Sequence, residues 1–237
     1  MTGALVPAVI PAGGPLVCLA EPFIWYVSVA RSCRQTKPDS GASGGLMMPI
    51  EVEMKFAIRD ETDFLKALTQ WDVQLGDREH QVDLYFAHPQ RDFRHTDEAL
   101  RIRRTERRVD VAYKGPRLDA RTKTRREIEL PLAGGERSAT QFTEILEALG
   151  FRPAGEVRKF RRAATLNVRG KTVTIALDRV DELGIFVELE IVADPGEVAV
   201  ARDALDFLAT ELALGATERR SYLELLAVRS VPDSPGT

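Results

Sequence analysis

The chain has 237 residues, of which 44% are hydrophobic and 29% are charged, and its formal net charge is -3. This length and composition are typical of a globular protein that holds one domain of ordinary to large size. Because 33 basic residues nearly cancel 36 acidic ones, the sequence excludes a global positive field that would attract nucleic acid non-specifically. Any anion site is therefore expected to be local.

Residues 1–48 differ from the rest of the chain, because prolines and glycines interrupt their apolar stretch. The first basic residue, Arg31, follows that stretch, whereas a secretory signal needs a basic segment before it. The stretch is also shorter than a membrane span. We predict a flexible N-terminal extension or an over-extended gene start with the true initiator at Met47 or Met48. A targeting or lipid-anchoring segment around Cys18 is the remaining alternative.

Both cysteines of the chain, Cys18 and Cys33, lie in this extension. The segment from residue 49 onward can therefore form no disulfide scaffold, and a reducing cytoplasm is the default location. We predict one folded domain over residues 49–228 and a disordered tail over residues 229–237.

From Pro49 onward, apolar and polar residues alternate over short runs, which is typical of β-strands with one polar face. Turn residues separate these runs, for example at Arg169-Gly170 and Leu183-Gly184. The predicted strands cover residues 50–58, 79–87, 98–105, 109–115, 123–131, 156–167, 171–181 and 185–193.

Helical periodicity predicts four helices, over residues 61–71, 138–149, 195–214 and 218–227. Strands dominate the order of elements, and helices come between its two halves and at its end. This order favours an α+β fold with an antiparallel sheet or barrel over a doubly wound parallel sheet. The leucine-rich positions of the last two helices are predicted to pack in the core or at the interface of a homodimer.

The first strand has the clearest charge pattern, because Glu51, Glu53 and Lys55 alternate with apolar residues and so project from one face. Two carboxylates and an ammonium group side by side can hold a divalent cation and contact a phosphate. Taken alone, such a strand is typical of a half-exposed sheet whose polar face meets water. The pattern returns, however, on one face of each later strand.

Alternation alone does not say whether the charged faces lie outside a sheet or inside a barrel. The predicted helices are amphipathic, and the apolar faces of the strands would give them a partner. The charged faces also mix basic and acidic residues in near-equal number. Buried unpaired charge costs several kcal/mol per ion, so such a lumen needs mutual compensation and bound ions. We therefore expect the charged faces to line an interior that holds water and ligand.

Seven short motifs, taken in order, resemble the CYTH domain of the triphosphate tunnel metalloenzymes over roughly residues 49–228. The motifs are Glu51-x-Glu53-x-Lys55, Arg101-x-Arg103, Lys114-Gly115-Pro116, Arg125-x-Glu127-x-Glu129, Lys159-x-Arg161, Asp178 and Glu188-x-Glu190. Each motif by itself is common in charged proteins, whereas the set at strand spacing is specific.

Within the family, the stretch from His80 to Phe86, the turn after Lys114 and the closing Arg219-Arg220-Ser221-Tyr222 are similar to the class IV adenylate cyclase branch. The resemblance implies an eight-stranded antiparallel β-barrel with helices packed outside, bound Mg²⁺ or Mn²⁺, and a substrate triphosphate in the lumen. It also implies either a cyclase that converts ATP to cyclic AMP and pyrophosphate, which we favour, or a triphosphatase acting on inorganic, thiamine or nucleoside triphosphate.

The charges of the motifs suggest two roles. Basic groups bind a triphosphate through charge-assisted hydrogen bonds, and we assign this role to Lys55, Arg101, Arg103, Lys114, Arg125, Lys159 and Arg161, with Lys123 as a further candidate. Carboxylates repel phosphate and suit a metal ion or the orientation of the basic groups, and we assign these roles to Glu51, Glu53, Glu127, Glu129, Asp178, Glu188 and Glu190. The first motif, with Glu51, Glu53 and Lys55, is the predicted catalytic set.

Two other interpretations stay open: a non-catalytic binder of polyphosphate or nucleotide, and a plain β-sheet protein whose charged face meets water. Nucleic acid and membrane partners are not expected. The basic residues between Arg101 and Arg126 point to both faces and lack an aromatic platform. The three histidines lack the spacing of zinc ligands, and we expect them to be structural or solvated.

Overall fold

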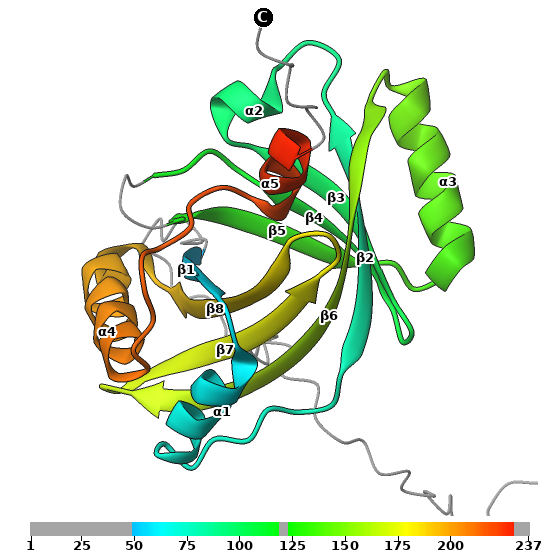
Figure 1. Cartoon of the computed structure of the whole chain (residues 1–237). Coiled ribbons are helices and arrows are strands. Elements are labelled where there is room, and N and C mark those ends of the chain that lie inside the picture. The colour runs from blue at the N-terminus through cyan, green and yellow to red at the C-terminus, as the bar shows by residue number, and fades with distance from the viewer. Residues whose placement is uncertain (1–48, 119–122, 230–237) are drawn as a thin grey trace, which may run out of the picture. The chain divides into compact units, whose positions relative to one another are not determined.

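A computed structural model describes residues 49–118 and 123–229 of the chain. Over these residues the strands form one closed barrel in the order β1-β5-β4-β3-β2-β6-β7-β8, with all neighbours antiparallel (Figure 1). The strands are β1 (Ile50–Ile58), β2 (Glu79–Ala87), β3 (Ala99–Thr105), β4 (Val109–Lys114), β5 (Arg125–Pro131), β6 (Arg152–Val168), β7 (Lys171–Val180) and β8 (Gly184–Ala193). The predicted eight-stranded antiparallel barrel is confirmed.

Helices pack outside the strands, as the fold prediction requires (Figure 1). They are α1 (Glu61–Thr69), α2 (Phe93–Thr96), α3 (Gly135–Ala148), the 3₁₀ turn η1 (Pro195–Glu197), α4 (Val198–Glu211) and α5 (Tyr222–Arg229). None of these helices is both long and apolar enough to cross a membrane.

Strand β1 is buried on both faces, which explains why its two sets of side chains differ so strongly. Val52 and Phe56 on the outer face are 0% and 2% exposed and belong to a core that includes Leu205 of α4. Glu53 and Lys55 on the inner face are 6% and 1% exposed. The plain-sheet interpretation with a solvated charged face is therefore wrong, because the charges are enclosed.

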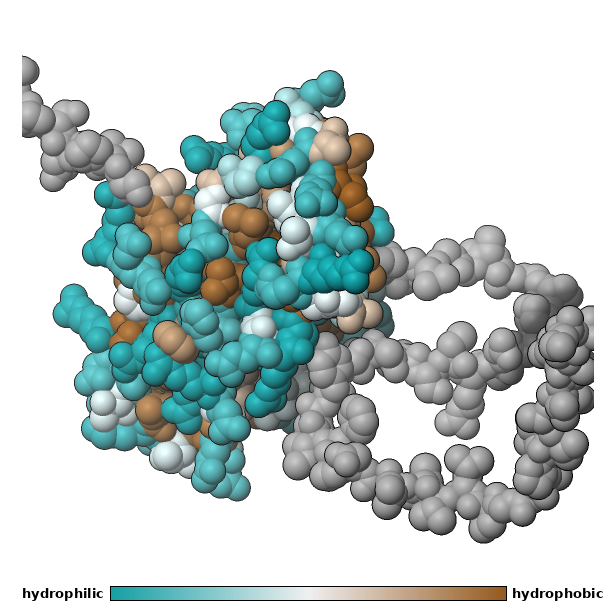
Figure 2. Space-filling model, turned by 90° about the vertical axis from the view of Figure 1, so that its right-hand side faces the viewer, coloured by the Kyte–Doolittle hydropathy of each residue, from teal (hydrophilic) through white to brown (hydrophobic). Residues whose placement is uncertain are grey.

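A second core lies under α3, where Ala139 and Leu146 contact the outer faces of β2, β3 and β4 through Phe86, Ile102 and Val111. In Figure 2, the face of the molecule that is seen is mostly hydrophilic, with hydrophobic residues in small separate groups. The apolar faces of the strands thus pack against helices, as amphipathic helices demand.

The turn residues Arg169-Gly170 predicted a hairpin at this position, and β6 and β7 form it. Arg169 and Gly170 have φ values of 52° and 78°, and two consecutive positive φ angles are typical of the type I′ turns that join antiparallel strands. The turn sets the register, in which Val168 pairs with Lys171 and Arg161 pairs with Asp178.

The last part of the chain differs from its prediction. The predicted helix over 195–214 is a 3₁₀ turn followed by α4, which ends before Ala213 with its positive φ of 50°. The predicted helix over 218–227 begins only at Tyr222, because the preceding segment is bonded to β1 through a Phe56–Thr217 bridge. The short helix α2 was not predicted, since four residues carry no periodicity. The predicted extension and most of the predicted tail lie outside the described residues.

Helix α5 lies over the ring of strands in Figure 1. Its Tyr222 packs in a cluster with Val157 of β6 and Phe186 of β8. Ser221 begins the helix with a capping box: its Oγ accepts from the Glu224 N–H at 3.1 Å, and its own N–H donates to the Glu224 carboxylate at 2.6 Å. Gly155 of β6 permits the close approach, because a Cβ there would lie 2.6 Å from Leu223 Cδ1 and its φ is 152°. The helix therefore rests directly on the barrel.

Candidate functional site: an ionic tunnel

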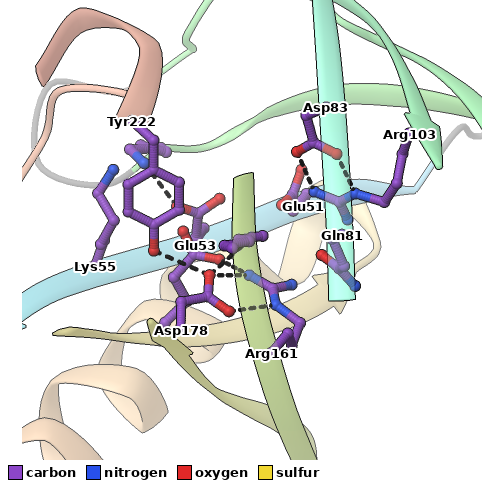
Figure 3. A network of polar contacts seen from close by, with 12 residues as sticks. Glu51, Glu53, Lys55, Gln81, Asp83, Arg103, Arg161, Asp178 and Tyr222 are labelled. Carbon is purple, nitrogen blue, oxygen red and sulfur yellow. Dashed lines mark hydrogen bonds and ion pairs between the residues drawn. The ribbon is translucent and has the colours of Figure 1, made fainter. Parts of the chain in front are cut away.

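The strand register places the charged residues on one shared face, the inside of the barrel. Residues directly opposite each other on neighbouring strands point to the same side, and the pairs include Glu53 with Glu190 and Lys55 with Glu188. Asp83 pairs in the same way with Arg103. Figure 3 shows Asp83 and Arg103 pointing toward each other from neighbouring strands, and Asp178 and Arg161 likewise. The lumen therefore collects charge from the whole barrel.

One group of contacts joins β1 to β4 and β5. The Lys114 ammonium donates to Glu51 at 2.8 and 2.9 Å and lies 2.8 Å from Glu127. Lys123 Nζ donates to Glu53 at 2.7 Å. Each ammonium group thus compensates carboxylates that are buried with it, which is the condition for keeping such charges inside a protein.

A second group centres on Asp178 of β7, which is 0% exposed. Its carboxylate accepts from Lys159 at 2.7 Å and from Arg161 at 2.6 and 2.7 Å. Arg161 also contacts Glu188 of β8, and the Tyr222 hydroxyl donates to Asp178 at 3.0 Å. One carboxylate therefore orients two of the predicted phosphate-binding cations and ties α5 to the lumen (Figure 3).

The third group lies on β2 and β3. Asp83 accepts two parallel hydrogen bonds from Arg103, both at 2.7 Å, and lies 3.4 Å from Arg101. This bidentate geometry fixes the plane of the guanidinium group. The sequence analysis included Asp83 in the stretch from His80 to Phe86 that resembles the cyclase branch, but it assigned this residue no role of its own.

Lys55 lies at the end of the lumen that α5 covers. Its ammonium group is 4.1 Å from the centre of the Tyr222 ring and donates to the backbone oxygen of Arg220. Burial, with the charge of Lys123 nearby, lowers the pKa of Lys55 to about 7. A lysine of this kind can gain or lose a proton near neutral pH.

Burial and neighbouring charges perturb the carboxylates in opposite directions. Burial, reinforced by Glu127 and Glu53, raises the pKa of Glu190 to about 6, and burial raises the pKa of Glu51 as well. Burial also acts on Glu53, but Lys123 outweighs it and lowers the pKa of Glu53 to about 2. Glu51 and Glu190 thus lie where negative charge is crowded and incompletely compensated.

The crowded carboxylates test whether the site fits a divalent cation. Among residues 49–118 and 123–229, no three acidic, histidine or cysteine side chains form a ready-made ion site. Glu51, Glu53 and Glu190 are nevertheless hard oxygen donors on neighbouring positions of β1 and β8. Burial and nearby carboxylates raise the pKa of Glu51 and of Glu190, and a bound cation would offset both causes. The donor set therefore fits a hard divalent cation.

Two arginines of the lumen have buried N–H donors that make no hydrogen bond within the part of the chain that the structure describes. Arg125 is 8% exposed, and its Nε makes no hydrogen bond with any residue that the structure describes. The same holds for the Nε of Arg101. Buried donors without acceptors are costly, so these two groups are suited to an anion that brings oxygen atoms.

The structure brings nearly all the predicted site residues into this lumen. Of the predicted set, Glu129 is exposed near the end of β5, although its register partner Ala112 lies on the inner face. The sequence analysis named Lys123 only as a further candidate, and it placed Tyr222 in a motif without assigning it a role in the site. Lys123 precedes β5, where alternation no longer defines a face, and Tyr222 belongs to a helix whose contact with the lumen has no sequence signal beyond the Arg-Arg-Ser-Tyr motif.

The fold and its lining define a class, the triphosphate tunnel proteins, in which a closed antiparallel barrel encloses paired acidic and basic side chains. The model of the CYTH domain family matches residues 49–222. The chain therefore belongs to the CYTH domain family, as its motifs predicted.

Relatives agree with this assignment. The chain is 35% identical over 179 residues to "Putative adenylate cyclase MJ0240" of Methanocaldococcus jannaschii, which covers 74% of this chain and 98% of that protein. The solved structure of the PH1819 protein of Pyrococcus horikoshii is 38% identical, with a TM-score of 0.66 and coverage of 76% of this chain and 99% of that one. A Vibrio parahaemolyticus structure, titled a "putative adenylate cyclase", shares the fold at 24% identity and a TM-score of 0.60, covering 75% of this chain and 98% of that one.

Proposed function

We propose that this protein is a metal-dependent enzyme that acts on a triphosphate inside the barrel, and that its reaction is the conversion of ATP to cyclic AMP and pyrophosphate. The observation that carries the proposal is the set of buried cations with unused donors, Arg101 and Arg125, beside the cations that Asp83 and Asp178 hold in place. The name of the Methanocaldococcus relative supports the cyclase over the triphosphatase.

The basic residues would bind the triphosphate along the lumen. Arg103 and Arg161 are held by carboxylates on one edge of their guanidinium groups, so they need little ordering when an anion arrives. Arg125 and Arg101 offer free donors on the same inner face. Together they would fix the phosphates and screen their mutual repulsion, which is most of what phosphoryl transfer asks of a protein.

Glu51, Glu53 and Glu190, with Glu188 beside them, would hold the Mg²⁺ or Mn²⁺. A divalent cation bound there supplies positive charge to the phosphate oxygens and lowers the pKa of a nearby hydroxyl. In the cyclase reaction the ribose 3′ oxygen bonds to the α-phosphorus, the bond from that phosphorus to the pyrophosphate oxygen breaks, and the hydroxyl proton is released. Lys55 Nζ, with its pKa of about 7, is the residue that can accept a proton at this end.

Product analysis tests the proposal directly. We expect the purified chain, with Mg²⁺ or Mn²⁺, to convert ATP to cyclic AMP and pyrophosphate in equal amounts. Orthophosphate from ATP, thiamine triphosphate or tripolyphosphate would replace the cyclase with the triphosphatase. Tight binding of tripolyphosphate in chelator without turnover of any substrate would instead show a non-catalytic binder.

A matched pair of variants tests the site. Arg125→Met removes a buried inner cation, whereas Arg158→Met removes an outer arginine that is 55% exposed and paired with Glu156. A hydrogen bond to a charged group contributes about 1.5–3 kcal/mol, so Arg125→Met should weaken tripolyphosphate binding by roughly 10- to 150-fold. Arg158→Met should leave it unchanged. Equal effects of the two variants would place the anion outside the barrel.

A further inference from the structure

Gln81 is a polar residue of the lumen that has no role in the phosphate grip described above. It lies on the inner face of β2, opposite Thr105 of β3 and Lys159 of β6, and it is 3% exposed. Figure 3 shows its side chain among the other side chains of the polar network in the lumen. A neutral amide at this position is unusual, because charged residues dominate the inner faces around it.

One end of the amide is fixed by a neighbour. Gln81 Nε2 donates to the Glu79 carboxylate at 2.7 Å. An ionised carboxylate only accepts hydrogen bonds, so Glu79 selects the orientation in which Nε2 faces it and Oε1 faces away. The amide could not be turned over without placing two acceptors against each other.

The other end is buried and unused. Gln81 Oε1 accepts no hydrogen bond from any residue in the described part of the chain. Lys159, which pairs with Gln81 in the strand register, donates to Asp178, and Arg103 donates two hydrogen bonds to Asp83. These cations are therefore committed to carboxylates, and the acceptor is suited to a donor that comes with a ligand.

The identity of that donor separates two kinds of substrate. An inorganic triphosphate presents acceptor oxygens to the lumen and has no donor for Oε1 when it is fully ionised. An organic triphosphate carries hydroxyl or amino groups on its non-phosphate part. A site with a buried acceptor discriminates strongly against a ligand that leaves the acceptor unpaired.

We propose that Gln81 is a specificity-determining residue: its Oε1 accepts a hydrogen bond from a hydroxyl or amino group on the organic part of a triphosphate, and so favours organic over inorganic triphosphates. The proposal rests on the proposed function, because it assumes that a triphosphate enters the barrel. It adds the residue that recognises the organic part of the substrate.

The experiment compares Gln81→Met, which removes the amide at nearly constant volume, with Gln74→Met in an exposed loop. Calorimetric dissociation constants and kcat/KM are measured for ATP and tripolyphosphate with Mg²⁺. Gln81→Met should weaken the binding of ATP about tenfold and should keep the dissociation constant of tripolyphosphate within about twofold of its wild-type value. Gln74→Met should change neither.

Substrate analogues locate the donor on the wild-type chain, which keeps the test valid if Gln81→Met does not fold. Binding is measured for 2′-deoxyATP, 3′-deoxyATP and purine riboside triphosphate, each of which lacks one donor group of ATP. One of them should bind about tenfold more weakly than ATP to the wild type and equally to Gln81→Met, because the interaction is then already lost.

Two results would overturn the proposal. An equal loss for ATP and tripolyphosphate in Gln81→Met would show that the residue only supports the barrel, and no loss for either would show that Oε1 is satisfied by water. Failure of the wild type to bind any triphosphate would refute the proposed function itself. Binding without turnover would refute only catalysis, and the comparison of dissociation constants would still decide the role of Gln81.

Discussion

Replacing Asp83 by Asn should destabilise the barrel strongly, because Asp83 is the buried partner of two arginines. Asp83 is 1% exposed, and its carboxylate accepts two hydrogen bonds from Arg103 at 2.7 Å and lies 3.4 Å from Arg101. Removing one partner of a buried ion pair costs about 3–5 kcal/mol. Asn keeps the volume and one acceptor, so we expect the lower end, about 3 kcal/mol.

Urea unfolding at pH 7 measures this loss, which corresponds to a fall of roughly 6–12 °C in the midpoint of thermal unfolding for a domain of this size. The matched control is Asp63→Asn, whose exposed pair with Lys66 spans 3.3 Å with side chains 85% and 72% exposed. Exposed pairs contribute little, and this variant should stay within about 0.5 kcal/mol of wild type.

The pH dependence gives an independent check. Burial acts to raise the pKa of Asp83, but Arg103 and Arg101 outweigh it and hold the pKa well below its ordinary value of 3.8. The stabilisation is therefore fully present above that ordinary value and is lost as pH falls through it toward the pKa in the folded state. The difference in the free energy of unfolding between wild type and Asp83→Asn should be constant above about pH 5 and should shrink below it. The reasoning would be refuted if Asp83→Asn lost less than about 1 kcal/mol in the free energy of unfolding at pH 7, or if its difference from wild type grew in acid.

Two further predictions concern α5 and the metal site. Tyr222→Phe removes the hydroxyl that donates to Asp178 but keeps the ring beside Lys55, so it should cost about 1 kcal/mol in urea unfolding; Tyr222→Leu should cost more, and equal losses would show that the ring contributes nothing. Glu190 has a pKa raised to about 6 by burial and by Glu127 and Glu53, so its ionised form opposes folding as pH rises from about 4.5 through 6. In chelator at pH 8, Glu190→Gln should therefore unfold at higher temperature than wild type, whereas added Mg²⁺ should raise the midpoint of wild type more than that of the variant. A variant that is less stable in chelator would contradict this account.

The strands and the composition of the lumen were predictable because both depend on local patterns. Alternation fixes which residues share a face of a strand, so Glu51, Glu53 and Lys55 had to project together. Turn residues such as Arg169-Gly170 fixed where hairpins form. The motifs then had the order of the CYTH domain, and the family match over residues 49–222 confirms it.

The partners inside the lumen were not predictable, because they depend on which strands become neighbours. The barrel order places β5 between β1 and β4 and places β2 beside β6, and only this arrangement brings Lys114 to Glu51 and Gln81 opposite Lys159. Helix α5 is likewise positioned by contacts with residues that are distant in sequence, which is why Tyr222 was quoted in a motif but given no role in the lumen.

The sequence by itself determined that each strand has one charged and one apolar face, since a period of two is a property of a single extended chain. Only the tertiary structure decided that the charged faces close around a common interior and that most cations there have a particular carboxylate partner. Closure and register are set by pairing between distant strands, and the few buried groups that this pairing leaves unsatisfied, Arg125 and Gln81 among them, are the ones through which the barrel would recognise its ligand.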